Sequence, residues 1–529
     1  MTNVQKRQRR KTPKVRSGCI TCKSVVSASA RLRLMNGRIR RIKCDEGKPS
    51  CSKCTSTGRN CDGYTSNPSS NQIVTTDTAH ETATTSKVGL PLSLLDDQLH
   101  INLPFYGWNL AEGDKRSIHH FVHRSAKDLT GPFQSQVWGS YVLSLCATSP
   151  AIQNAVIALS GFHERFCSPV AAVASLQGCF QHYHNAVKTI NSLLDGQNRR
   201  SASTIQETLV ACTIFICIEI LIGNDAAALT HLEGGLGILR QMRTTMSSNT
   251  SSTTDPKVVD LFGLFARLDL QALSFVSSRP SIEPIRVSAP LPNPPASNLY
   301  RVIRRAQHFL RSTAEPLKYS DEIPAVAFRE RELHLADLDS WYEAFKSQRS
   351  YIKTAENIAN LLVAYHSTRI KLLVCLGPFE IAYDTCSTNF RAIVEAADCI
   401  LASRLPLCLS DDKKYFTLES SIIEPLYFTS LKCRHPQLRR RALSLLRRSG
   451  KEGIWDGIVM AEIANFVIAL EDGWTDSDEY TSDELCVEES RRVHGTAVRI
   501  DRVAKTVDVE CSLRSEDGVW HFRNVVLAW

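Results

Sequence analysis

The sequence predicts a mostly α-helical protein with a small cysteine-rich module near its N-terminus, a flexible linker and a large helical domain that ends in a short β-meander. Helical periodicity dominates from about residue 114 to 470. Six of the 18 cysteines fall within 43 residues near the N-terminus, and three stretches between residues 498 and 522 alternate at period two. With 529 residues, 43% of them hydrophobic and 22% charged, the chain can bury a large core and should hold at least two units.

Charge is distributed unevenly along the chain. Residues 1–64 hold 17 Lys and Arg against 3 Asp and Glu, a net charge of +14, whereas the remainder holds 46 against 51, a net charge of −5. Such a basic segment favours nucleic acid as a partner, because Lys and Arg that neutralise phosphates release counterions. By charge alone, a solubilising tail is an equally good interpretation. We assign residues 1–18 to a basic N-terminal tail.

The six clustered cysteines have the spacing of metal ligands. They are Cys19, Cys22, Cys44, Cys51, Cys54 and Cys61. Two CxxC pairs stand among them, and each CxxC turn places two sulfurs about one edge of a zinc tetrahedron apart. Six thiolates cannot give two Zn(II) ions four separate ligands each, so two sulfurs must bridge in a binuclear cluster. Because sulfur fills every coordination position, we expect the zinc to be structural and not catalytic.

A disulfide framework is the weaker alternative for these cysteines. The basic first sixteen residues lack the apolar stretch of a secretory signal, which predicts a reducing compartment. The longest apolar run, Leu209–Gly223, spans 15 residues and contains Glu219. We therefore expect a buried helix there and no transmembrane span.

The cysteine module resembles the fungal six-cysteine binuclear zinc cluster transcription factors. The resemblance lies in the residues from Gly18 to Lys23, in those from Ile39 to Cys54, and in the final cysteine. It implies that Cys19 and Cys51 bridge the two zinc ions. It further implies that Cys22 and Cys44 complete one ion and that Cys54 and Cys61 complete the other.

The same resemblance implies where DNA is read. Arg40, Arg41 and Lys43 would lie at the start of a helix that reads a CGG-like triplet in the major groove, with Lys23 as a further DNA contact. Cationic side chains suit this task because they pair with guanine O6 and N7. The simpler alternative is that these residues contact only phosphate. Residues 19–64 are thus assigned to a zinc cluster DNA-binding domain.

The module departs from the family pattern at one place. The family has six residues between its second and third cysteines, whereas Cys22 and Cys44 are separated by 21. Removing either residues 24–38 or residues 23–37 restores the family spacing, and we interpret 24–38 as an insertion translated from a short intron. The longer loop costs about 1 kcal/mol in closure entropy, against about 10–16 kcal/mol from structural zinc. Zinc binding should therefore survive, but the insertion could displace the DNA-reading helix.

The chain after the zinc module is predicted to form a flexible linker followed by helices. Residues 65–90 are rich in Ser, Thr and Asn and predict a disordered linker, and no heptad repeat follows the zinc module. Helical periodicity then predicts a helix after Ser149-Pro150 and further helices over residues 180–194, 226–242, 258–275 and 355–375. Six prolines in residues 280–295 predict an irregular connection between two helical halves. Residues 91–470 are assigned to an α-helical regulatory domain, because Trp138, 149–159 and 227–239 resemble the one found in many of these regulators.

Other motifs in the body carry weaker functional signals. The Gly234-Gly-Leu-Gly sequence lies inside a helical pattern, which argues against a phosphate-binding loop. Five histidines could suggest a second metal, but packed or surface histidines are favoured because no carboxylates pair with them. They are His119, His120, His123, His182 and His184. The scattered cysteines, such as Cys146 and Cys217, fit buried small side chains.

The C-terminal region contains an acidic segment and a set of strands. From residue 471 to 489 there are nine acids and no base, with aromatic residues between them. We assign 471–490 to an acidic segment that is either an activation segment or a solvated loop. Residues 491–529 then alternate at period two, with a turn at Ser515-Glu-Asp-Gly, and predict a short β-meander.

These observations favour a nuclear, zinc-dependent, sequence-specific DNA-binding regulator of RNA polymerase II transcription. Its partners would be double-stranded DNA and the transcription machinery or co-regulators; a homodimer through the body stays open, and no membrane partner is expected. A basic import signal is assigned to Lys6, Arg7, Arg9, Arg10 and Lys11. The alternative is a regulatory interaction protein whose DNA-binding module is disabled by the insertion. The sequence has no HExxH, nucleophile elbow or Walker loop, and we do not expect an enzyme.

Overall fold

The computed structural model describes residues 110–529 except for 132–136, 170–171, 196–200, 247–255, 276–293, 350–351, 353, 405–413 and 474–486. The predicted basic tail, zinc module and linker, which together span residues 1–90, lie outside the described residues. Residues 1–100 and 101–529 separate into two units, and only the second is described below.

The first part of this unit consists of helices. They are α3 (Glu112–His120), α4 (Ala126–Thr130), α5 (Val142–Cys146), α6 (Pro150–Cys167), α7 (Leu176–Asp195), α8 (Ala202–Ile222), α9 (Asp225–Met246) and α10 (Pro256–Phe275). Two π-helical turns, Phe121–Ser125 and Val137–Tyr141, lead into α4 and α5. The helices predicted from periodicity over 180–194, 226–242 and 258–275 are therefore confirmed as α7, α9 and α10.

Helix α6 begins where the sequence predicts. The Ser149 hydroxyl accepts a hydrogen bond from the Ile152 amide at 3.1 Å, and Pro150 occupies the first turn. A proline is tolerated there because its missing N–H would have no partner inside the helix. Val156 and Leu159 follow Ile152 on one fully buried face. The cap therefore fixes where the helix begins, and the apolar face packs it into the core.

Helix α8 is a core helix. It is long and apolar enough to cross a membrane, but 72% of its most apolar window is buried inside the protein, and it packs against α6 and α9. It ends at Gly223, whose φ of +84° is the left-handed conformation that glycine adopts without a Cβ penalty. The predicted buried helix is confirmed.

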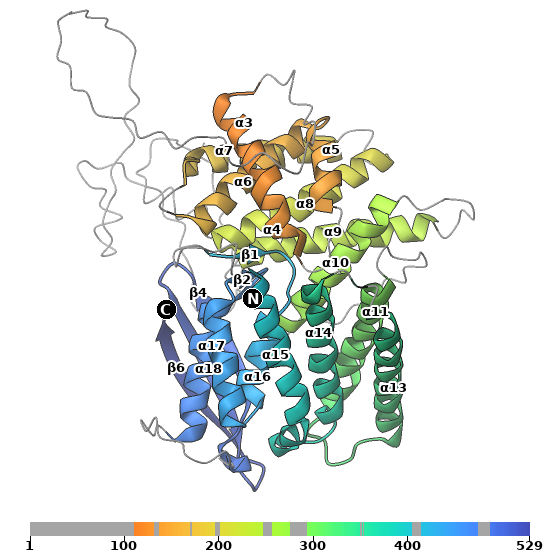
Figure 1. The fold of residues 1–529 in the computed structure, drawn as a ribbon, viewed down its shortest axis with the longest axis vertical. Coiled ribbons are helices and arrows are strands. Elements are labelled where there is room, and N and C mark those ends of the chain that lie inside the picture. The colour runs from red at the N-terminus through yellow and green to blue at the C-terminus, as the bar shows by residue number, and fades with distance from the viewer. Residues whose placement is uncertain are drawn as a thin grey trace, which may run out of the picture. The chain divides into compact units, whose positions relative to one another are not determined.

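The second part of the unit is a further group of helices, drawn in green to blue in Figure 1. They are α11 (Pro294–Phe309), α12 (Glu315–Leu317), α13 (Ala325–Gln348), α14 (Ala355–Val374), α15 (Ser387–Arg404), α16 (Ile423–Lys432), α17 (Pro436–Arg448) and α18 (Gly457–Asp472). Leu310–Ala314 forms a π-helical turn, and Glu380–Cys386 and Glu489–Arg491 form 3-10 helices. Helix α14 confirms the prediction over 355–375, and most of the proline-rich 280–295 lies outside the described residues.

Two hydrophobic cores hold these helices. The larger core joins most of the helices from α4 to α10 with α14–α18 and the meander. The smaller core joins α11, α13 and α14 through residues such as Ile303, Leu338 and Tyr365. Helix α14 belongs to both, since Val363 lies in the larger core and Tyr365 in the smaller one. The two cores therefore meet along α14.

The described residues contain two small sheets. β1 (Phe416–Thr417), β2 (Lys451–Glu452) and β3 (Trp455–Asp456) form one, with β1 parallel and β3 antiparallel to β2. The sequence did not predict this sheet, because a two-residue strand cannot show alternation. β4 (Val493–Asp501), β5 (Thr506–Arg514) and β6 (Trp520–Ala528) form the predicted antiparallel meander. Fold class and meander are thus confirmed.

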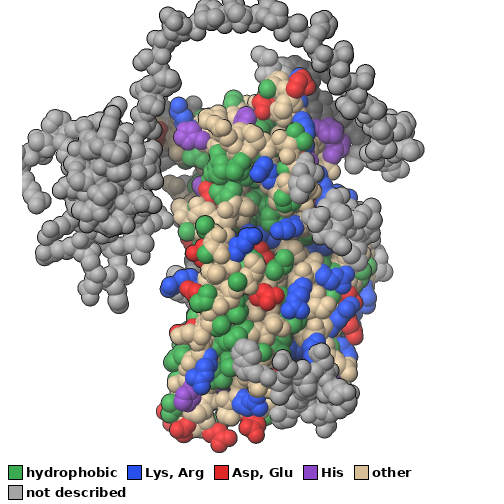
Figure 2. All heavy atoms as spheres, turned by 90° about the vertical axis from the view of Figure 1, so that its left-hand side faces the viewer, with side chains coloured by type: hydrophobic (Ala, Val, Ile, Leu, Met, Phe, Trp, Pro, Cys, Tyr) green, Lys and Arg blue, Asp and Glu red, His purple; other side chains and the backbone are tan. Residues whose placement is uncertain are grey.

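The meander packs one face on the body and leaves the other exposed. Val507, Val509 and Cys511 of β5 are buried in the larger core, and β5 packs against α18, beside which Figure 1 draws the strands. On the outer edge strand β6, Phe522 is 55% and Val526 65% exposed. Figure 2 views the molecule from this side, where hydrophobic side chains lie among basic ones.

Candidate functional site

The residues singled out from the sequence for zinc and DNA lie outside the described residues. The zinc ligands are Cys19, Cys22, Cys44, Cys51, Cys54 and Cys61, and the DNA contacts are Lys23, Arg40, Arg41 and Lys43. The import signal Lys6, Arg7, Arg9, Arg10 and Lys11 lies outside them too. The geometry described below is therefore that of the helical body.

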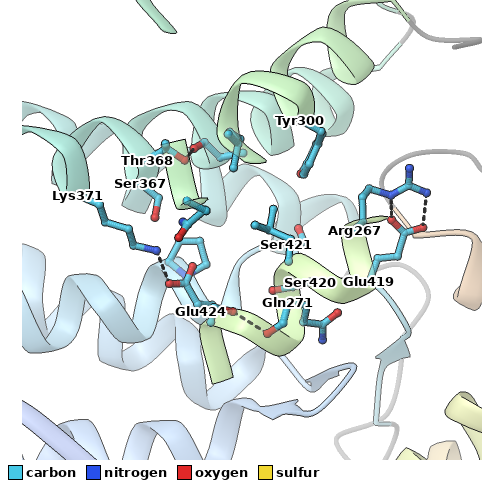
Figure 3. A pocket seen from close by; sticks show the side chains of 16 residues that line it. Arg267, Gln271, Tyr300, Ser367, Thr368, Lys371, Glu419, Ser420, Ser421 and Glu424 are labelled. Atoms are coloured by element: carbon cyan, nitrogen blue, oxygen red, sulfur yellow. Dashed lines mark hydrogen bonds and ion pairs between the residues drawn. The ribbon is translucent and has the colours of Figure 1, made fainter. Parts of the chain in front are cut away.

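The body contains a small pocket where the two cores meet. Its walls come from α10, α11, α14 and residues 419–425, which include the first residues of α16, and its volume is about 90 Å³. Most of the labelled side chains around it are polar (Figure 3). No sequence motif marked these residues, because they come from four segments that only the tertiary fold brings together.

Two ion pairs stand at opposite ends of the pocket in Figure 3. On one side, the Arg267 guanidinium donates two hydrogen bonds to the Glu419 carboxylate, and the one from Nη2 to Oε1 has a length of 3.2 Å. On the other, Lys371 Nζ lies 2.6 Å from Glu424 Oε1. Burial raises the pKa of Glu419 and outweighs the opposite effect of Arg267. Two cations and two carboxylates leave these four residues with no net charge.

Two of the residues that line the pocket each carry a buried polar atom with no hydrogen-bond partner among the residues that the structure describes. They are Gln271 Oε1 and Ser367 Oγ, on residues that are 7% and 4% exposed. The other end of the Gln271 amide is occupied, because its Nε2 donates to the Glu452 carbonyl at 3.1 Å. Buried polar atoms normally have partners, and leaving one unpaired costs about 1–3 kcal/mol. Both atoms have almost no accessible surface, so each is closed off from the space inside the pocket.

Glu452 holds one of the segments that line the pocket. Its carboxylate accepts hydrogen bonds from the backbone amides of Ser421, Ile422 and Ile423, at 2.8, 2.9 and 3.0 Å. It also pairs with Arg404 at 3.2 Å. The amides at the start of a helix lack partners inside the helix, so a carboxylate there satisfies them and complements the helix dipole. This arrangement fixes the segment 419–425 at the entrance to α16.

A second group of buried charges fastens the meander to the helices. The Glu471 carboxylate of α18 accepts from Arg434 at 2.8 Å, from Arg439, and from the backbone amide of Val493 at 2.7 Å. Arg492 is fully buried and donates to Asp384 at 2.7 and 2.8 Å. The start of β4 is therefore held by charges as well as by apolar packing.

Glu380 lies at the centre of the same group. Lys432 Nζ is 2.6 Å from its carboxylate and also donates to the carbonyls of Val493 and His494, at 2.9 Å each. Lys318 lies 3.1 Å from the other carboxylate oxygen. Burial by itself raises the pKa of Glu380, but the neighbouring cations hold it at about 2. Sequence reasoning missed this group, because its members are spread from residue 318 to 494 in no motif.

These contacts change the interpretation of the predicted acidic segment at its ends. Glu471 lies in α18 and is buried, and Glu489 accepts hydrogen bonds from the amides of Glu380 and Ile381, at 2.7 Å each. Glu471 is therefore not a solvated acid, and Glu489, whose side chain is 23% exposed, caps two specific amides of the body. Residues 474–486, between these ends, lie outside the described residues.

The histidines are held by the body in packed or paired positions. His119 and His123 have ring centroids 4.2 Å apart, His120 lies 3.2 Å from the hydroxyls of Ser160 and Ser125, and His182 lies 2.8 Å from Asn154 Oδ1. These are packed or paired positions, but His182 Nε2 also lies 3.2 Å from Asp114 Oδ1, so the expectation that no carboxylate pairs with these histidines is wrong for His182. His184 is exposed at the surface.

One buried group has the donor types of a metal site. His163 Nε2 lies 3.4 Å from Cys167 Sγ and 3.7 Å from Asp128 Oδ2, and its Nδ1 lies 3.1 Å from Ser125 Oγ. These three side chains could hold a metal ion between them. However, Arg124 already supplies a positive charge 2.7 Å from Asp128. Burial lowers the pKa of His163 to about 3, so a neutral imidazole completes a buried hydrogen-bond network.

The glycine-rich sequence lies in the interior of α9. A Cβ at Gly235 would meet Phe265 Cε1 of α10 at 2.1 Å, whereas a Cβ at Gly234 would meet nothing within 4 Å. Gly235 therefore lets α9 and α10 approach closely. The motif has a packing role, in line with the expectation that it is no phosphate loop.

The scattered cysteines are mostly packed in the core. Cys146, Cys217 and Cys511 are examples, and all ten in the described residues are free thiols. Burial raises the pKa of Cys146 to about 12, which keeps this thiol protonated and unreactive. Cys399 is exposed and is the exception to the predicted pattern among these residues.

Comparisons with known proteins identify two domains. The fungal specific transcription factor domain matches residues 116–450, which is more than half of the chain. The fungal Zn(2)-Cys(6) binuclear cluster domain matches residues 36–71. This second range includes the last four of the six clustered cysteines and begins after Cys19 and Cys22.

Several curated proteins are similar to this chain. The aspercryptin biosynthesis cluster-specific transcription regulator atnN of Emericella nidulans is 27% identical over 429 residues, which are 74% of this chain and 65% of the relative. Transcription regulator lscL of Purpureocillium lilacinum is 28% identical over 216 residues, which are 40% of this chain and 49% of the relative. Transcriptional regulatory protein moc3 of Schizosaccharomyces pombe is 39% identical over 62 residues, 12% of this chain and 9% of the relative.

The chain thus spans less than two thirds of the length of these relatives. No solved structure matches it. The domains and the names of the relatives are those of transcription regulators and not of enzymes. The chain belongs to the family of fungal transcription regulators that combine a Zn(2)-Cys(6) binuclear cluster domain with a fungal-specific transcription factor domain.

Proposed function

We propose that the protein is a nuclear, zinc-dependent regulator that binds specific DNA sequences and controls transcription by RNA polymerase II. The observation that carries this proposal is the pairing of the two matched domains in one chain. The basic residues 1–64 supply the charge that DNA binding needs. The basic residues from Lys6 to Lys11 are proposed as its import signal.

In this proposal two structural Zn(II) ions are held by all six clustered cysteines, with Cys19 and Cys51 as the bridges. Six thiolates suit zinc, and sharing two sulfurs gives each ion four ligands. Bound zinc stabilises a module that is too small to fold on a hydrophobic core alone. The zinc has no open coordination position, so its task is to present the DNA-reading residues.

Arg40, Arg41 and Lys43 are proposed to read a CGG-like triplet, with Lys23 as a further contact. A guanidinium that donates two hydrogen bonds to guanine distinguishes that base from the other three in the major groove. The helical body, which includes the matched residues 116–450, would then regulate the DNA-bound protein through co-regulators. A homodimer would let it bind two such triplets.

The insertion gives a second candidate function. The matched zinc cluster range begins at residue 36, close to the end of residues 24–38, which supports the interpretation of this segment as foreign to the module. If every copy of the protein carries it, the DNA-reading helix is displaced and the protein would act only through its helical body. Transcript sequencing across codons 23–39 would show whether the segment remains in the mature messenger RNA.

DNA selection on two forms of the full chain separates the two functions. One form has the sequence as given, and the other lacks residues 24–38. We expect the shortened form to enrich CGG-containing duplexes at fixed salt, and Arg41→Ala in that form to lose about 1–3 kcal/mol of discrimination. Loss of a phosphate contact would instead weaken all duplexes alike. If the shortened form enriches no sequence, specific DNA binding is wrong, and if both forms enrich the same sequence, the disabled-module alternative is wrong.

A further inference from the structure

We propose that strand β6 pairs edge to edge with β6 of a second copy of this chain, so that two three-stranded meanders join into one continuous antiparallel sheet. The proposal gives a surface to the homodimer of the proposed function, and the use of that dimer in DNA binding rests on the proposed function. The pairing itself involves only the C-terminal sheet and needs no DNA. It follows from the open edge of β6, from the composition of the strand and from its match to itself.

The backbone of β6 has one edge bonded to β5 and one edge open. β6 is the last strand in the order β4-β5-β6, no other strand among the described residues pairs with it, and Figure 1 draws it as the outermost strand. The amide of Trp529 donates to the Lys505 carbonyl at 3.2 Å, and the amide of Ser515 donates to the Val519 carbonyl at 2.9 Å.

These two bonds fix which residues of β6 face the open edge. They join directly opposite residues at the two ends of the β5–β6 ladder, and hydrogen-bonded pairs alternate with non-bonded pairs along an antiparallel ladder. The odd-numbered residues of β6 therefore bond to β5. The even-numbered residues direct their N–H and C=O groups to the open edge: Trp520, Phe522, Asn524, Val526 and Ala528.

β6 lacks the features that normally keep an edge strand from pairing. Natural edge strands are usually very short, or they carry lysine, proline or a bulge. β6 has 9 residues, none of them proline or lysine, and its register with β5 runs without a bulge. Its edge-facing residues Trp520, Phe522 and Val526 have exposed apolar side chains. An edge this long, regular and apolar is a template for another strand.

The side chains of β6 match a second copy of the same strand. When two β6 strands pair antiparallel about Asn524, every edge-facing residue lies opposite an edge-facing residue of the second copy, which forms about ten backbone hydrogen bonds. Phe522 then lies opposite Val526 of the second copy, and Trp520 lies opposite Ala528 of the second copy. Each large side chain meets a smaller one, and such cross-strand pairs stabilise a sheet. The two Asn524 amides lie opposite each other and can exchange hydrogen bonds.

The charges also suit pairing with a second copy. Arg523 is the only Lys or Arg in the strand, and in this register it lies opposite Val525 of the second copy. Asp508 and Glu510 belong to β5, one strand further from the edge. No like charges therefore lie directly opposite each other, an arrangement that would destabilise the pairing. Any strand could supply the backbone bonds, but the side-chain match is a property of β6 itself, which favours a second copy over a foreign strand.

The test measures self-association of the full chain without DNA, by analytical ultracentrifugation. A double lysine variant, Phe522→Lys with Val526→Lys, places lysines opposite lysines of the second copy. A double glutamate variant at the same positions does the same with carboxylates. The matched control is Ala497→Lys with Val503→Lys, which adds two lysines at exposed apolar positions in β4 and the turn after it, away from β6.

We expect the wild type to dimerise, the double lysine variant to raise the dimer dissociation constant at least about tenfold, and the control to leave it within about twofold. A mixture of the lysine and glutamate variants should associate at least about tenfold more tightly than either alone, because each lysine then lies opposite a glutamate. Unfolding temperatures check that each variant folds. Val526→Pro gives a second measurement with the same expected loss, because it removes an amide that β5 does not use.

Three results would overturn the pairing. They are a wild type that stays monomeric up to about 100 μM, a dimer that the lysine variant and the control weaken equally, and a mixture that associates no better than its components. The first result would leave a strand of another protein as the occupant of the edge. A monomeric wild type that still selects DNA would overturn only the pairing, whereas a β6-dependent dimer that selects no DNA would overturn only the proposed function.

Discussion

Two neighbouring glycines in α9 should respond in opposite directions to the same substitution. Gly234 faces solvent, and a Cβ there meets nothing within 4 Å. Gly235 is buried, and its Cβ would lie 2.1 Å from Phe265 Cε1 and 2.5 Å from Cζ. Alanine at each position adds one methyl group to the same turn of the same helix.

The magnitude follows from two terms. Replacing glycine with alanine in a helix interior stabilises by about 0.5–1 kcal/mol, because less backbone entropy is lost on folding. At Gly235 the fully buried Phe265 ring must also move by more than an ångström, and overpacking of this kind costs about 1–3 kcal/mol or more. The helix term is common to both variants, so the difference between them measures the overpacking alone.

The assay is chemical denaturation of the full chain, followed by circular dichroism. We expect Gly234→Ala to raise the free energy of unfolding slightly and Gly235→Ala to lie about 1–3 kcal/mol below it. A Gly235→Ala protein as stable as Gly234→Ala would show that α9 and α10 do not pack as closely as described. A double variant with Phe265→Leu, which makes room for the methyl group, should recover part of the difference.

Three further predictions concern the removal of a buried carboxylate, the pH dependence of stability and the zinc content of the protein. Glu471→Gln removes the nearest carboxylate from the buried guanidinium groups of Arg434 and Arg439, which keep only the longer contacts to Glu380 and Asp472. It should cost about 3–5 kcal/mol, or about 3–6 °C in unfolding temperature for a body of this size. Asp398→Asn, in an exposed pair, should cost under ~1 kcal/mol, and equal effects of the two substitutions would refute a buried role for Glu471. Burial by itself raises the pKa of Glu380, but the neighbouring cations hold it at about 2, below the ordinary value near 4.3. The stability that Glu380 contributes is therefore present above about pH 4.5 and is lost as the pH falls towards 2. Glu380→Gln should make the unfolding temperature depend less on pH over this window, and an unchanged pH dependence would contradict the assignment. Metal analysis of the full chain should find two zinc ions, with Cys19→Ser lowering both and Cys61→Ser weakening one first; a single zinc in the wild type would rule out the binuclear cluster.

Local patterns in the sequence were sufficient to predict those elements whose physical cause lies within a few neighbouring residues. The start of α6 depends on a serine hydroxyl three residues from the amide it accepts from, and such a cap can be read directly from Ser149-Pro150. The burial of α8 follows from its continuous apolar composition, and the meander follows from alternation at period two. Each of these features is decided within one stretch of chain, by the next few residues along it.

The pocket and the buried charges were decided by contacts between distant segments. Arg267 and Glu419 are 152 positions apart, and Lys318 and Glu380 are 62 apart. In the sequence they are ordinary charged residues, and nothing nearby distinguishes a buried pair from two solvated side chains. The same holds for Glu471, which reads as the first residue of an acidic segment and lies in the interior because Arg434 and Arg439 neutralise it there.

The sequence by itself therefore determined the family, the candidate zinc ligands, the positions of the long helices and the C-terminal strands, because spacing and periodicity express coordination geometry and backbone repeat directly. Only the tertiary structure decided which charges are buried, how closely α9 approaches α10 and where a small pocket opens between two cores. Those features depend on which surfaces meet after the chain folds, and burying a charge or a polar atom is tolerable only when a partner from elsewhere in the chain arrives at the same point.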